Sequence, residues 1–180
     1  MRRRTFLRSA SAFALVGAAG CTAPGRPEIR MESGRSVLHP VSEQFIANGL
    51  QPHGRDRLYV TATADSSPDI LGPDADSSIV DVLTNSGMDQ FHVVVQLRSS
   101  PVAPMELWPA PGHAFEWIDR SRLRTRVVVE PWGSLDRIDD RERRDALRSA
   151  DELVHTAVWS LTPGLEDLPS EIQFVLAARN

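Results

Sequence analysis

The sequence predicts a mainly β fold, and two patterns lead to that prediction. Several runs alternate apolar and polar residues with a period of two, which is typical of half-buried strands. Only one stretch, over residues 136–153, combines high charge with helical spacing. Because each strand would bury one face, we expect an antiparallel β-sandwich, immunoglobulin-like in its strand number, with one surface helix. The alternative is a two-layer α+β arrangement.

The expected strands follow one another along the chain. Residues 37–50 predict an edge strand or a short helix. Clear alternation begins at residues 57–64 and is strongest at residues 90–98, where Phe91, Val93, Val95 and Leu97 would face inward and His92 outward. The remaining alternating runs are residues 113–117, 122–130, 154–161 and 171–176. We expect these strands to supply the core of the molecule.

The expected helix lies within residues 136–153. Two acid–arginine pairs, Asp139/Arg143 and Asp140/Arg144, are spaced four apart with the acid first, the favourable order on a helix. A narrow apolar stripe includes Leu147. This pattern predicts a helix that lies on a sheet with its charged face in solvent.

The N-terminal residues have the layout of an export signal. Four arginines, at positions 2, 3, 4 and 8, precede an apolar run at residues 10–20. A helix of that length would rise only ~17 Å, against ~30 Å of hydrocarbon in a bilayer. The run therefore predicts a signal segment and not a membrane span.

Two motifs in this segment resemble known targeting signals. Arg3, Arg4, Phe6 and Leu7 form a pattern that resembles the twin-arginine export motif. Ala18, Ala19 and Gly20 precede Cys21 in a pattern that resembles a lipobox, in which the cysteine is lipidated and becomes the new N-terminus. The start of the chain is similar to exported lipoproteins of halophilic archaea. The resemblance implies attachment to the extracytoplasmic face of the cell membrane.

The domain division follows from this resemblance and from composition. We expect residues 1–20 to form the signal peptide, residues 21–36 a lipidated and polar tether rich in Pro and Gly, and residues 37–180 a single domain. With Cys21 lipidated, no thiol remains for a disulfide, a thiolate metal site or a cysteine nucleophile.

Charge excludes one class of partner. All 20 basic residues are arginine, against 24 acidic residues, so removal of the four signal arginines leaves a net charge of −8. An acidic, lysine-free composition is typical of proteins from salty, GC-rich organisms. It argues against nucleic-acid binding, which needs a basic surface.

Motifs for catalysis or metal binding are weak. The five histidines show no helical metal-ligand spacing, and no Gly-x-Ser-x-Gly motif occurs. An acidic, turn-rich stretch offers oxygen ligands for a hard cation, although the EF-hand order is absent. Its candidate ligands are Asp65, Asp69, Asp74 and Asp76. We expect no cofactor.

A proline-rich stretch at residues 98–117 offers a possible partner-docking loop. Its apolar residues Met105, Leu107 and Trp108 stand among four prolines, which disfavour a central strand. The alternative is that Trp108 folds back over the core. The sequence thus predicts a lipid-anchored binding or accessory domain, rather than an enzyme, that holds a protein or small ligand. The competing interpretation is a small extracytoplasmic hydrolase or a metal-binding protein that uses His and Asp.

Overall fold

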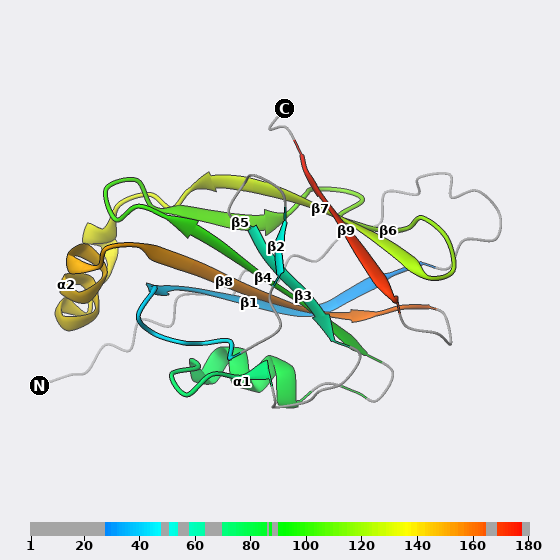
Figure 1. Ribbon diagram of the computed structural model, residues 1–180, viewed down its shortest axis with the longest axis horizontal. Coiled ribbons are helices and arrows are strands. Elements are labelled where there is room, and N and C mark those ends of the chain that lie inside the picture. The colour runs from blue at the N-terminus through cyan, green and yellow to red at the C-terminus, as the bar shows by residue number, and fades with distance from the viewer. Residues whose placement is uncertain are drawn as a thin grey trace, which may run out of the picture.

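The computed structural model describes residues 28–47, 51–53, 58–63, 70–85, 87, 90–164 and 169–177, with the backbone alone at 51–53 and 58–63. Two β-sheets face each other in this part of the chain (Figure 1). The predicted β-sandwich is therefore confirmed. None of the described helices is long and apolar enough to cross a membrane.

The first sheet has five antiparallel strands in the order β1-β8-β4-β3-β2. Its bounds are β1 Arg30–Pro40, β2 Gln51–His53, β3 Leu58–Thr63, β4 Phe91–Ser99 and β8 Leu153–Thr162. The long strand β1 forms one edge. It begins at Arg30, so residues 30–36, which we predicted as tether, belong to the sheet.

The second sheet is built around β7 (Arg122–Pro131). The strands β5 (Met105–Pro109) and β6 (Phe115–Trp117) pair antiparallel with successive parts of β7, and β9 (Glu171–Leu176) pairs with its other edge. The β7–β9 pair is parallel, which the expectation of a wholly antiparallel sandwich did not include.

The main core lies between the two sheets. The alternating residues predicted to face inward on β4 do so, and β5, β7, β8 and β9 complete the core. Its buried residues are Phe91, Val93, Val95, Leu97, Leu107, Leu123, Val127, Ala157, Trp159, Leu161 and Phe174. Burial of these side chains, at about 1.5–3 kcal/mol each, is the main source of stability.

A helix that the sequence analysis missed covers the other face of the first sheet. Helix α1 (Ser77–Thr84) packs Ile79, Val82 and Leu83 against Val94 and Val158 of the sheet. In Figure 1 α1 lies on the side of the first sheet away from β5 and β7. The strands β4 and β8 are consequently buried on both faces, so the prediction that each strand buries only one face is wrong for them.

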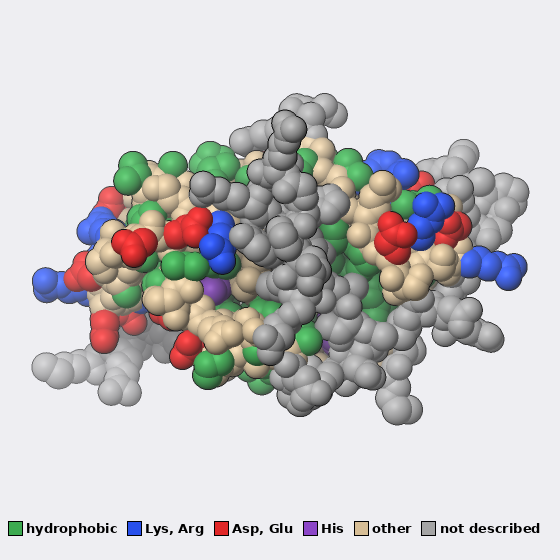
Figure 2. Space-filling model, viewed as in Figure 1, with side chains coloured by type: hydrophobic (Ala, Val, Ile, Leu, Met, Phe, Trp, Pro, Cys, Tyr) green, Lys and Arg blue, Asp and Glu red, His purple; other side chains and the backbone are tan. Residues whose placement is uncertain are grey.

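The predicted surface helix is present but shorter. Residues 135–137 form a 3₁₀ turn, and α2 spans Arg141–Ser149 with Asp140 as its N-cap. Its buried residue Leu147 packs with Leu38, Leu135 and Leu153 in a third, smaller cluster. Helix α2 therefore closes one end of the sandwich (Figure 1). Acidic and basic side chains gather over α2 and at the opposite end of the molecule (Figure 2).

Candidate functional site

A groove lined mainly by polar and charged residues lies between helix α1 and the first half of strand β1. It encloses about 520 Å³ and is open to solvent. Its lining comes from β1, from α1 and from the residue before β4: Glu32, Ser33, Arg35, Ser78, Asp81, Val82, Asn85 and Gln90. Because α1 turns its apolar face onto the sheet, the flank that carries Ser78, Asp81 and Asn85 is left beside β1.

Local capping positions the helical side of the groove. Asp76 accepts hydrogen bonds from the backbone N–H of Ser78, at 2.8 Å, and from the Ser78 hydroxyl, at 2.5 Å. Such an N-cap satisfies backbone donors that the first helical turn leaves free. The N-cap thus fixes the backbone and the Ser78 hydroxyl at the start of α1.

The groove carries charges of both signs. Asp81 and Glu32 supply carboxylates, and Arg35 supplies a guanidinium group. The Thr162 hydroxyl donates to one oxygen of Glu32 at 3.0 Å, which orients that carboxylate at the edge of the sheet. Hydroxyl and amide groups surround these charges, so the groove offers hydrogen bonds to ammonium and carboxylate groups alike.

Three polar residues on neighbouring strands form a row across the first sheet beside this groove. Ser33 of β1, Ser160 of β8 and His92 of β4 occupy one row, because Ser160 is the register partner of both. The Ser160 hydroxyl contacts Gln90 Oε1 at 2.7 Å. His92 is fully buried, which contradicts its predicted outward position, because α1 covers this face. Burial lowers the pKa of His92.

His39 belongs to a second buried polar network. Its Nδ1 donates to the carbonyl of Pro40 at 3.0 Å, and its Nε2 accepts from the Thr156 hydroxyl at 2.8 Å. The Gln96 side-chain amide donates to the same hydroxyl at 2.9 Å, and this assigns the proton directions. The ring of Phe45 stacks on His39 at 3.7 Å. Burial lowers the His39 pKa to about 4.

His155 lies on the opposite face of the first sheet, under β5. The backbone N–H of Leu107 donates to its Nδ1 at 3.2 Å, so Nε2 carries the proton of the neutral ring. The indoles of Trp132 and Trp108 lie 5.5 and 6.4 Å from the ring, centre to centre. Burial, with a smaller contribution from His39, lowers the His155 pKa to about 3. Both histidines are therefore neutral structural groups at neutral pH.

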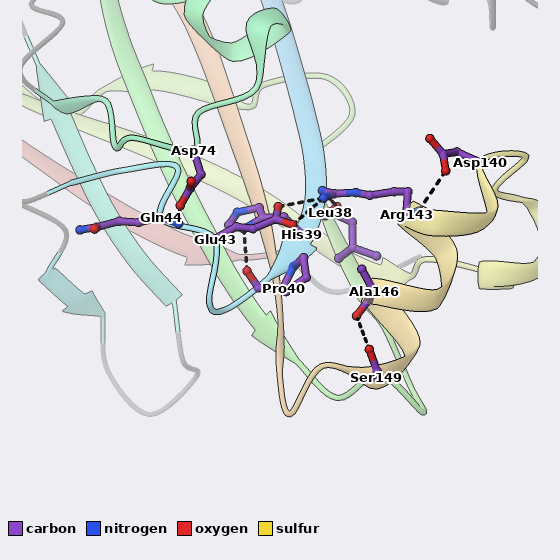
Figure 3. A network of polar contacts seen from close by, with 10 residues as sticks. All are labelled: Leu38, His39, Pro40, Glu43, Gln44, Asp74, Asp140, Arg143, Ala146 and Ser149. Atoms are coloured by element: carbon purple, nitrogen blue, oxygen red, sulfur yellow. Dashed lines mark hydrogen bonds and ion pairs between the residues drawn. The ribbon is translucent and has the colours of Figure 1, made fainter.

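An ion pair joins α2 to the end of β1 (Figure 3). Arg143 donates from Nη1 to both carboxylate oxygens of Glu43, each at 2.8 Å, and from Nη2 to the Leu38 carbonyl at 2.9 Å. Each of the two side chains is about 30 % exposed. It fixes α2 against the edge strand and lies away from the groove lining.

The predicted cation ligands have structural roles where they are described. Asp74 accepts from the Gln44 backbone N–H at 2.9 Å, and Asp76 caps α1. Asp65 and Asp69 lie outside the described residues. Within the described ranges, no three His, Cys, Asp or Glu side chains are grouped so that they could hold a metal ion.

The predicted partner loop is the edge strand β5. Leu107 is fully buried in the main core and is not available to a partner, and Met105 is partly buried against that core. Trp108 is 45 % exposed and is the most accessible member of the trio. Strand alternation separates them, since Met105 and Leu107 point inward and Trp108 does not.

The signal and lipobox residues, including Cys21, lie outside the described residues. No family model, curated protein or solved structure matches the chain. The sequence analysis missed the groove because it missed α1. The signal that could have found that helix is Asp76 followed by apolar residues at positions 79, 82 and 83, an N-cap with helical spacing.

Proposed function

We propose that the chain is a lipid-anchored extracytoplasmic domain that binds a small zwitterion, such as a free amino acid, in the groove between α1 and β1. The observation that supports this binding function is the groove itself, with its mixed charge. Arg35 would pair with the ligand carboxylate, and Asp81 would pair with its ammonium group.

The neutral side chains favour such a ligand over a larger apolar one. Ser33, Ser78, Asn85 and Gln90 present both donors and acceptors, and Val82 is the single apolar residue of the lining. Binding at such an open site replaces hydrogen bonds to water with hydrogen bonds between protein and ligand, so the net gain in binding free energy is modest. We expect a dissociation constant in about the millimolar to micromolar range.

The proposed location rests on the N-terminal motifs. Mass spectrometry of membrane-extracted protein should show loss of residues 1–20 and added lipid mass on Cys21. The Cys21→Ser variant should appear in the medium, and the variant with Arg3→Lys and Arg4→Lys should stay in the cell. Normal export of the lysine variant, or retention of the Cys21→Ser chain at the membrane, would contradict the location without affecting the groove.

The binding proposal is tested by titrating the Cys21→Ser chain with glycine, with glucose as an uncharged comparison probe. We expect glycine to bind and glucose not to. Asp81→Asn and Arg35→Gln should each weaken glycine binding by about tenfold, the loss of one charged hydrogen bond. Arg141→Gln, on an exposed side chain of α2 outside the groove lining, is the matched control and should bind as the parent does. Equal binding by the parent and both groove variants would refute the site.

A further inference from the structure

The groove between α1 and β1 carries more charge than a simple zwitterion such as glycine would use. Its lining includes two carboxylates, Glu32 and Asp81, and one guanidinium group, Arg35. Arg35 donates to the Gly34 carbonyl at 3.0 Å, and Glu32 accepts from the Thr162 hydroxyl. Within the described part of the chain, none of these three charged side chains forms an ion pair. A bound zwitterion would pair with Arg35 and Asp81, so the Glu32 carboxylate would remain without a counter-charge.

A β-bulge places Glu32 on the groove side of β1. Met31 and Ser33 pair with consecutive residues of β8, so Glu32 between them is the extra residue of the strand. In a regular strand neighbouring side chains point to opposite faces, and only one of Glu32 and Ser33 would reach the groove. With the bulge, both residues line it, and the Thr162 hydroxyl holds the Glu32 carboxylate at 3.0 Å. Bulges that re-aim a side chain are frequent beside functional sites.

Helix α1 and strand β1 run in opposite directions along the groove. Asp74, just before α1, accepts a hydrogen bond from the backbone N–H of Gln44, which lies beyond the end of β1. Gln90, which follows α1, leads into β4, whose first residue pairs with Leu161 in the row of Met31. The start of α1 therefore faces the later part of β1, and the end of α1 faces the beginning of β1.

This direction sets the order of the charged groups along the groove. Arg35 of β1 and Ser78 of α1 lie at one end. Glu32 and Asn85 lie at the other end, and Asp81 stands between the two ends. The two ends are roughly 10 Å apart, whether measured as seven residues of helix or as three residues of strand. A ligand whose carboxylate pairs with Arg35 and whose ammonium group pairs with Asp81 can therefore extend toward Glu32.

The Glu32 end of the groove favours a cation for a second reason. The helix dipole gives the C-terminal end of a helix a negative partial charge, which attracts cations. The C-terminal end of α1 lies at this end of the groove, and its last turn contains no basic residue. The groove encloses about 520 Å³, within the ~300–1,000 Å³ of sites that hold ligands much larger than glycine. The Glu32 end thus has both the charge and the room for a cationic side chain of the ligand.

On the premise that the groove is a zwitterion site, we propose that it selects a basic amino acid, whose side chain carries a second cationic group, and that Glu32 binds this group. The ligand carboxylate pairs with Arg35, its α-ammonium group with Asp81 and its side-chain cation with Glu32. A lining with one cation and two anions has a net charge of −1, and a basic amino acid of charge +1 neutralises it. Glu32 is accordingly the residue that determines specificity.

The test compares L-lysine with L-norleucine, which has the same carbon chain without the side-chain ammonium group. The full-length chain with Cys21→Ser is titrated with each by NMR. Lysine should bind about tenfold more tightly than norleucine, the gain of one hydrogen bond between charged groups. Glu32→Gln should abolish this difference and leave the affinities for norleucine and glycine unchanged. Glu28→Gln, at an exposed glutamate outside the groove lining, is the matched control and should keep the preference for lysine.

The outcomes separate the ligand class from the binding function itself. If glycine binds but lysine binds no more tightly than norleucine, the basic ligand class is wrong and the zwitterion site stands. This comparison uses the parent chain, so it does not depend on the folding of any variant. Unchanged lysine affinity in Glu32→Gln, or an equal loss in Glu28→Gln, would also overturn the role of Glu32. If none of the three amino acids binds, the zwitterion site itself is refuted. Retained glycine binding and the circular dichroism spectrum show whether Glu32→Gln is folded.

Discussion

Acid should destabilise this protein through its buried histidines. His39 and His155 are at most 1 % exposed, and their pKa values in the folded state are about 4 and about 3, below the usual 6.5. The unfolded chain therefore binds more protons between those values and pH 6.5. Folding stability is fully present above pH 6.5 and falls as the pH is lowered toward the folded-state values.

The size of the effect follows from the width of that window. From pH 6.5 to pH 5, each histidine lowers the free energy of unfolding by about 1.4 kcal/mol per pH unit, which amounts to about 2 kcal/mol. The two together should lower the free energy of unfolding by about 4 kcal/mol, a large part of the 5–15 kcal/mol of an ordinary domain. The lowered pKa of His92 acts in the same direction, and the raised pKa of Glu106 acts against it.

The assay is urea unfolding at pH 7.5 and pH 5. The variants His39→Asn and His155→Asn keep a hydrogen-bonding group near Nδ1 and remove the titration. Each should lose about 2 kcal/mol less than the parent between the two pH values, whatever its stability at pH 7.5. His113→Asn, at an exposed position, is the control and should match the parent. If both buried variants lose as much stability as the parent, the burial argument is wrong.

Packing gives two further predictions. Leu147→Ala removes a side chain that is 1 % exposed in the cluster under α2, and should lower the free energy of unfolding by about 2–5 kcal/mol. The exposed Leu176→Ala should change it by less than ~0.5 kcal/mol, and equal losses in urea unfolding would contradict the described burial. Gly72→Ala would place a Cβ 1.8 Å from the Gln44 carbonyl oxygen, so we expect a loss of about 3 kcal/mol. Gly112 has a φ of +85° and open space around it, so Gly112→Ala should cost about 1 kcal/mol. A larger loss of stability in thermal unfolding for Gly112→Ala than for Gly72→Ala would refute the close approach of Gly72 to Gln44.

Period-two alternation was sufficient to predict most of the sandwich. The runs at residues 90–98, 122–130 and 171–176 are strands β4, β7 and β9, because their apolar residues reach one shared core. Alternation could not reveal that β4 and β8 have a second buried face. That depends on α1, a helix whose first five residues were interpreted as part of an acidic loop.

The same omission explains most of what was missed at the candidate site. His92 was predicted to face solvent since it lies opposite the core-facing residues of β4, and α1 covers it. The residues of the groove are distant in sequence and share no motif, so only the packing of α1 against β1 brings them together. Trp108 was identified as a partner residue only from the composition of its proline-rich stretch. Strand alternation then leaves Trp108 exposed and Leu107 buried.

The most direct test of the proposed binding function is an NMR titration of the Cys21→Ser chain with glycine, followed through the side-chain amides of Asn85 and Gln90. Both amides line the groove, so we predict saturable shifts at these two resonances, and the Asp81→Asn variant should need about tenfold more glycine to reach the same shifts. Shifts that are absent, that never saturate, or that persist unchanged in Asp81→Asn would contradict a zwitterion site between α1 and β1.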